Sequence, residues 1–105
     1  MKKILFSHAR TALKYGLISL NLKKNDIILT PGYICHVVVD SIKNSYLKHE
    51  YYRIDSNLEP DWEHIEEKLK IFPNIKGIIA VHYFGKPQNI EKFLIIKKKY
   101  NLFLI

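Results

Sequence analysis

Cysteine is almost absent from this sequence, and its scarcity excludes two kinds of scaffold. The 105 residues contain a single cysteine, Cys35, so they cannot form an internal disulfide framework. One cysteine also leaves no Cys-x-x-Cys zinc or redox motif. We therefore expect a fold that depends on its apolar core, in a reducing compartment such as the cytoplasm.

Long apolar runs are also lacking. The longest runs, residues 77–81 and 102–105, are far shorter than the ~20 residues that a membrane helix requires. The N-terminus carries Lys2 and Lys3 but no long apolar stretch or small-residue cleavage site typical of a signal peptide. The sequence predicts no membrane association and a cytoplasmic location.

The composition is that of a folded, basic chain. Apolar residues make up 48% of the sequence and aromatic residues 12%, which is typical of one packed domain. The formal net charge of +7 favours anionic partners such as nucleic acid, anionic lipid or a phosphorylated small molecule. The lysines are scattered, and the triplet at 97–99 follows the pattern of a solvated helix end more than that of a nucleic-acid patch.

Short apolar runs alternate with amphipathic segments, which predicts an α/β unit with a mostly parallel sheet and alternating helices. The expected strands are residues 4–7, 26–30, 50–54, 77–81 and 102–105, and the expected helices are residues 10–21, 34–42, 58–72 and 89–100. The run at 77–81 is continuously apolar, so we expect it to be a central strand covered on both faces.

Helical spacing predicts which side chains face the core. They are Leu13, Leu17 and Leu20; Ile34, Val37, Val38 and Ile42; Trp62, Ile65 and Leu69; and Ile90, Phe93 and Tyr100. In open α/β sheets, ligands bind outside the carboxyl ends of the strands. We therefore expect the chemistry of this chain at residues 7–10, 31–35 and 82–85.

Four segments, taken in order, resemble the DegT/DnrJ/StrS family of pyridoxal-phosphate-dependent sugar aminotransferases. They are FSHARTAL at 6–13, TPGYICH at 30–36, LEPDW at 58–62 and VHYFGKP at 81–87. The resemblance covers essentially the whole chain. It implies that residues 1–105 form part of the large, cofactor-binding domain of a fold-type-I pyridoxal-phosphate transferase, truncated before its C-terminal remainder.

The first of these segments corresponds to the turn that holds the cofactor phosphate in the family. A helix N-terminus presents free N–H groups and a positive dipole end to an anion. The resemblance gives this role to the backbone amides of Arg10 and Thr11, with the Thr11 hydroxyl as a further donor. Ala9 stands where the family usually has glycine. The alternative to phosphate binding is that Ser7 and Thr11 only cap the helix.

The second segment corresponds to the part of the family that stacks an aromatic ring on the pyridine of the cofactor. The stacking position falls on Cys35, and a thiol cannot stack. Either Tyr33 turns in to replace the ring, or a softer contact covers that face. A catalytic pair of Cys35 and His36 is disfavoured, because adjacent residues on a helix do not face each other.

His82 matches the family's histidine in the Val-His-x-x-Gly segment, and we expect it in or beside the cofactor pocket. A structural histidine bonded to the backbone is the alternative. The remaining histidines have no common metal-ligand spacing, so no metal site is predicted. They are His8, His36, His49 and His64.

The resemblance also implies what these residues lack. In the family, the strand matching residues 102–105 runs into an acidic pair whose Asp binds the pyridine nitrogen, and the lysine that binds the cofactor covalently lies farther on. No residue of this chain is assigned a catalytic role. We expect the chain not to transaminate alone and to expose an unpaired sheet edge. A truncated gene, one half of a split enzyme, or an incomplete record would each account for it.

The resemblance therefore implies an N-terminal fragment of an aminotransferase that acts on a keto sugar. Its expected partner is the missing C-terminal half or a full-length relative. The intact family forms homodimers. Two alternatives stay open: a small non-catalytic basic α/β module that binds an anionic partner, and an interaction protein for a full-length relative.

Overall fold

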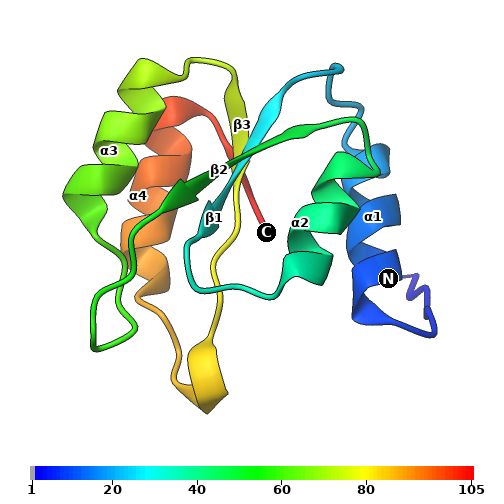
Figure 1. The fold of residues 1–105 in the computed structure, drawn as a ribbon, viewed down its shortest axis with the longest axis horizontal. Helices are drawn as coiled ribbons and strands as arrows, with labels where there is room; N and C mark the ends of the chain where they lie inside the picture. The colour runs from blue at the N-terminus through cyan, green and yellow to red at the C-terminus, as the bar shows by residue number, and fades with distance from the viewer. Residues whose placement is uncertain (1) are drawn as a thin grey trace.

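The computed structural model describes residues 2–105, which form an α/β unit of three layers (Figure 1). One sheet has the strand order β2-β1-β3-β4, and every pairing in it is parallel. The strands are β1 Ile27–Pro31, β2 Lys48–Tyr52, β3 Ile75–Ile78 and β4 Phe103–Leu104. The α-helices are α1 Ala9–Ser19, α2 His36–Lys43, α3 Trp62–Ile71 and α4 Ile90–Tyr100, and a short 3-10 helix, η1, spans Tyr83–Gly85. The predicted fold class is confirmed.

The helices cover both faces of the sheet, with α1 and α2 on one face and α3 and α4 on the other (Figure 1). Side chains alternate along β1 as the pleat requires. Ile27 and Leu29 join the core beneath α3 and α4, whereas Ile28 joins the core beneath α1 and α2. All of β1 is buried, and it lies inside the sheet. β3 is the other inner strand, as predicted for the apolar run that begins at Gly77.

The predicted inner faces of α1 and α3 are confirmed. Leu17 of α1 is buried, and Leu13 and Leu20 pack against the same core cluster. On α3, Ile65 and Leu69 are buried. Both helices therefore follow the spacing of their apolar residues.

The predicted inner faces of α2 and α4 are only partly correct. Ile34 precedes α2, because the helix begins at His36, and the buried residues of α2 include Val39 as well as the predicted Ile42. On α4, Phe93 is buried, but Ile90 is 38% exposed at the first helical position and Ile96 is buried in its place.

The strand predicted at residues 4–7 is wrong. These residues are not in a strand, and the side chains of Ile4 and Leu5 are 76% and 81% exposed. A strand needs a neighbour for its backbone hydrogen bonds, and within residues 2–105 no strand pairs with this segment. Phe6 instead stacks on Tyr15, with 5.7 Å between ring centroids.

Two strands begin and end earlier than predicted. β2 ends at Tyr52, and Ile54 forms an isolated antiparallel bridge with Pro60 instead of extending the strand. β3 ends at Ile78, although hydrogen bonds to neighbouring strands continue beyond it. The Ile79 N–H donates to Leu29 at 2.9 Å, and the Ala80 N–H donates to Ile105 at 2.9 Å.

Candidate functional site

An apolar cavity lies where open α/β sheets bind ligands. The connection after β1 leads to α2 on one face, and the connection after β3 leads to α4 on the other (Figure 1). This reversal marks the point, at the carboxyl edge of the sheet, where open α/β sheets bind ligands. A cavity of about 580 Å³ lies at this edge. Its lining residues are Leu13, Tyr33, Ile34, Cys35, Val38, Ile79, Val81, Tyr83, Phe84 and Ile105.

Tyr33 lines this cavity and is held by Tyr83. The two rings are stacked, with centroids 5.4 Å apart and planes 20° from parallel, and the Tyr83 hydroxyl donates to the Tyr33 carbonyl. Burial raises the pKa of Tyr83, and the neighbouring Tyr33 raises it further, so this hydroxyl stays protonated as a donor. Tyr33 is thus an aromatic wall of the cavity, but one face of its ring is already covered.

Cys35 is the N-cap residue of α2, and its exposed thiol lines the same cavity. The side chain makes no capping hydrogen bond to the helix. The cavity therefore has a small, polarizable group at the position where the resemblance calls for an aromatic ring.

Arg10 and Thr11 lie in the first turn of α1, at a different cavity. Both line a polar groove between α1 and α2 that also contains Lys14, Asp40 and Ser41. The Thr11 N–H donates to the His8 carbonyl at 3.1 Å, whereas within residues 2–105 the Arg10 N–H donates to no acceptor. Only one of the two predicted backbone donors is therefore free for an anion.

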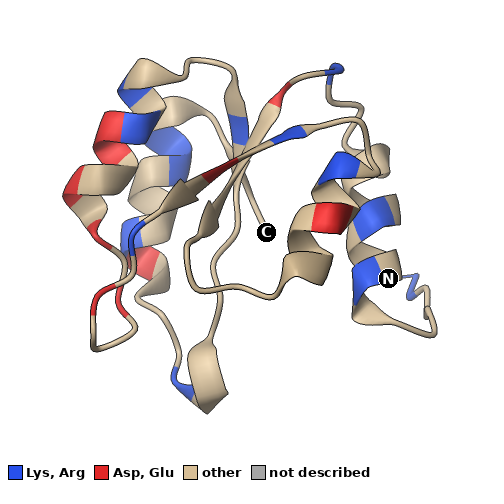
Figure 2. Cartoon of the chain, in the orientation of Figure 1, with Lys and Arg blue, Asp and Glu red and all other residues tan. Residues whose placement is uncertain are grey.

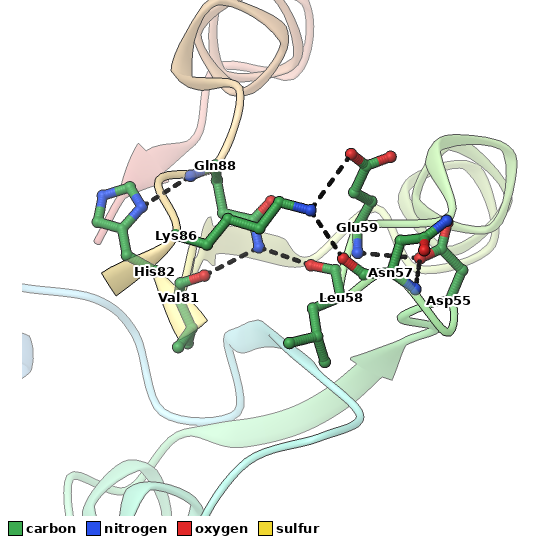
Figure 3. A network of polar contacts seen from close by, with 8 residues as sticks. All are labelled: Asp55, Asn57, Leu58, Glu59, Val81, His82, Lys86 and Gln88. Carbon is green, nitrogen blue, oxygen red and sulfur yellow. Dashed lines mark hydrogen bonds and ion pairs between the residues drawn. The ribbon is translucent and has the colours of Figure 1, made fainter. Parts of the chain in front are cut away.

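His82 follows β3 and lies in a network that joins two loops at the carboxyl edge of the sheet (Figure 3). Its Nδ1 accepts from the Gln88 N–H at 2.9 Å. The His82 side chain is exposed. Its chain neighbours Val81 and Tyr83 line the apolar cavity, whereas His82 does not. Gln88 lies just outside the VHYFGKP motif at 81–87, so the sequence did not identify it as a functional residue.

The structure places two of the five predicted site residues, Tyr33 and Cys35, in one cavity. His82 follows β3 at the same edge of the sheet but does not line that cavity, and Arg10 and Thr11 line the polar groove. The apolar cavity suits a flat ring. The predicted phosphate donors line the polar groove instead, where Arg10 and Lys14 outnumber the single acidic residue, Asp40. Within residues 2–105 the predicted set does not form one complete site for pyridoxal phosphate.

Sequence reasoning did not single out Phe84, although it lies within the VHYFGKP motif. Its backbone is left-handed, with φ at 51°, and its side chain is 83% exposed at the mouth of the cavity. A positive φ is uncommon for a bulky residue and costs energy. The glycine that follows was the available signal for a tight turn here.

Lys and Arg residues lie on helices on both faces of the sheet (Figure 2). The triplet 97–99 lies in the last turn of α4, as predicted, and Lys99 pairs with Glu66 at 3.3 Å. In the described part of the chain, no three His, Cys, Asp or Glu side chains are placed to share a metal ion. Every described helix is too short or too polar to cross a bilayer.

Proteins that are similar to this chain in sequence or fold include an uncharacterised protein and several aminotransferases. The uncharacterised protein MJ1066 of Methanocaldococcus jannaschii is 30% identical over 94 residues, which are 89% of this chain and 24% of that protein. NtdA of Bacillus subtilis, solved with bound cofactor PMP, has a TM-score of 0.80 and 26% identity, with 90% of this chain and 22% of NtdA covered.

A third similar structure is PseC of Helicobacter pylori, an aminotransferase involved in the biosynthesis of pseudoaminic acid. Its TM-score is 0.84 at 20% identity, with 94% of this chain and 27% of PseC covered. The chain thus spans about a quarter of the length of these relatives. The model of the DegT/DnrJ/EryC1/StrS aminotransferase family matches residues 2–105, and the chain belongs to that family.

Proposed function

We propose that this chain supplies the first quarter of a pyridoxal-phosphate-dependent aminotransferase, as part of its cofactor-binding domain, and that the enzyme acts on a nucleotide-linked keto sugar in polysaccharide or sugar biosynthesis. The family match over residues 2–105 carries the proposal. The apolar cavity at the carboxyl edge supports it, because this is the edge where such sheets bind ligands.

The predicted residues have separate roles in this proposal. Tyr33 and Cys35 cover the ring of the cofactor, and His82 lies at its edge. Arg10 and Thr11 hold the phosphate once the remaining part of the domain lies against α1. The bound cofactor supplies an electron sink, and the groups that use it lie outside these residues.

We also propose that the chain acts in the cytoplasm and that its partner is a polypeptide carrying the rest of the family's fold. That polypeptide is either a separate C-terminal half or a full-length relative. We propose that the complete assembly forms a homodimer, as the intact family does. Purification from its source and identification of the chains that remain bound at high salt tests this proposal.

A chimera tests the proposed function. Residues 2–105 replace the matching segment of NtdA, which provides the remaining three quarters of a related fold. The purified chimera is assayed for transfer of an amino group from glutamate to a panel of keto sugars and keto acids. We expect turnover of at least one acceptor. A folded chimera that transfers no amino group to any acceptor contradicts the proposal.

A matched pair of variants tests the phosphate role of Thr11. In the chimera, Thr11→Val keeps the shape of the side chain and removes its hydroxyl, and we expect cofactor affinity to fall by about tenfold, as for loss of one charge-assisted hydrogen bond. Ser19→Ala removes a hydroxyl that bonds only to Gly16 at the far end of the same helix, and should leave affinity unchanged. Equal affinities in both variants would remove Thr11 from the site.

The alternative of a basic module predicts a different result. Binding of the chain to an anionic polymer would weaken steeply with salt, because counterions are released on binding. Electrophoretic mobility shift at two salt concentrations distinguishes this alternative from the proposed aminotransferase role.

A further inference from the structure

Two loops at the carboxyl edge of the sheet are tied together by the side chain of Gln88. Residues 53–61 join β2 to α3, and residues 79–89 join β3 to α4. The Gln88 side-chain amide nitrogen donates to the Leu58 carbonyl at 2.9 Å and to the Val81 carbonyl at 3.0 Å (Figure 3). One amide group therefore bridges the two loops.

The orientation of this amide follows from its partners. Leu58 and Val81 both present carbonyl oxygens, which can only accept. A flipped amide would place its own oxygen against two carbonyls. The amide nitrogen must therefore face them.

The same residue holds His82 through its backbone. The Gln88 N–H donates to His82 Nδ1 at 2.9 Å, so this nitrogen must carry a lone pair. In the neutral ring the proton is then on Nε2. Figure 3 shows the second ring nitrogen on the side away from the network, and the side chain is exposed. His82 thus offers one exposed N–H donor at the carboxyl edge of the sheet.

We propose that Gln88 is a positioning residue that fixes His82 as the Nε2–H tautomer, so that His82 donates a hydrogen bond to an oxygen acceptor of the bound ligand. The identity of the ligand as pyridoxal phosphate or its sugar substrate rests on the proposed function. The tautomer and the role of Gln88 do not depend on it.

Nuclear magnetic resonance of the ¹⁵N-labelled full chain tests the proposal, in neutral to alkaline buffer. A hydrogen bond from the Gln88 N–H to His82 Nδ1 transmits a nitrogen–nitrogen scalar coupling, and long-range proton–nitrogen spectra assign the tautomer. We expect the coupling and a single Nε2–H tautomer. Absence of the coupling in the wild-type chain overturns the proposal.

Two variants separate the role of Gln88 from general stability. Gln88→Glu keeps the size of the side chain but has no donor for Leu58 and Val81, so the loops separate and the coupling to His82 is lost. Lys86→Gln removes a different contact between the same loops, in which Lys86 Nζ donates to the Asn57 carbonyl at 3.0 Å, and should retain the coupling. Retention of the coupling in Gln88→Glu, or its loss in both variants, contradicts a specific role for Gln88.

Titration with pyridoxal 5′-phosphate or inorganic phosphate distinguishes this inference from the proposed function. A shift of the His82 Nε2–H signal with pyridoxal phosphate alone supports a ring or substrate oxygen as acceptor, and a shift with both ligands supports a phosphate oxygen. If the coupling is present and neither ligand shifts the signal, the ligand-binding part of the proposal fails, and the tautomer assignment stands.

Discussion

At the scale of single residues, the packing of the sheet depends on the absence of a side chain at Gly77. A Cβ atom at this position would lie 2.9 Å from Ile28 Cδ1 and 3.5 Å from the Phe103 carbonyl oxygen. Ile28 is fully buried, so its Cδ1 atom would have to shift within the core. Gly77 therefore allows the close approach of β3 to its neighbours.

Gly77→Ala should destabilise the chain by about 1–3 kcal/mol, the range for overpacking a filled core. Gly16→Ala is a matched control, because nothing lies within 4 Å of a Cβ at this position in α1. It should stabilise the chain by roughly 0.5–1 kcal/mol through helix propensity. Urea unfolding measures both, and a neutral Gly77→Ala contradicts the packing described above.

The lowered pKa of His49 predicts that the stability of the chain depends on pH. The imidazole Nε2 lies 2.6 Å from the hydroxyl of the buried Thr30, and burial lowers the pKa of His49; Glu50 partly opposes this effect, and Lys43 adds to it. The folded state thus resists protonation more than the unfolded state, whose pKa is near the ordinary 6.5. Stability is complete above this value and falls as the pH drops through it.

Thermal unfolding between about pH 8 and pH 5 should therefore show a falling midpoint. His49→Gln keeps a polar partner for Thr30 but does not titrate, so its midpoint should be flatter over the same window. The lowered pKa values of Asp61 and Glu66 act only at lower pH, because their ordinary values are 3.8 and 4.5. An unchanged slope in His49→Gln would show that another group causes the effect.

At the scale of elements, helix positions could be predicted from sequence better than strand positions. The buried residues of α1 and α3 follow the helical period, which each helix satisfies by itself. A strand is defined by its neighbour, and the apolar segment at residues 4–7 has none within residues 2–105. Local pattern could not supply that information.

This difference predicts the effect of substitutions in the N-terminal segment. Exchange of Ile4 for Asp and Leu5 for Ser should change the free energy of unfolding by less than about 0.5 kcal/mol, because both side chains are exposed. Leu17→Ser, at a residue 2% exposed, should cost about 2–5 kcal/mol. A large loss from the Ile4 and Leu5 exchange would show that the segment packs as a strand after all.

At the scale of the whole molecule, the site could be predicted only in part. The rule for open α/β sheets placed Tyr33, Cys35 and His82 at one edge, where the cavity lies. Spacing along the sequence could not show that Arg10 and Thr11 face a different groove, or that Gln88 holds His82, because these depend on how α1 packs on α2 and on a contact between two loops.

We expect the purified 105-residue chain to show no transamination of keto sugars with glutamate and added pyridoxal phosphate. We expect this because the resemblance gives no residue of this chain the role of the family's pyridine-binding Asp or cofactor-binding Lys. Product formation is measured by chromatography, with the NtdA chimera as the positive control. Steady turnover by the chain alone would contradict this expectation.

The cofactor content of the NtdA chimera tests the central claim most directly, since it asks whether these residues can form their part of the cofactor site. After exhaustive dialysis, the visible absorbance of bound pyridoxal phosphate is measured together with circular dichroism. We predict stoichiometric cofactor in a chimera whose helix and strand content matches that of NtdA. A chimera that is equally well folded but holds no cofactor would contradict the account.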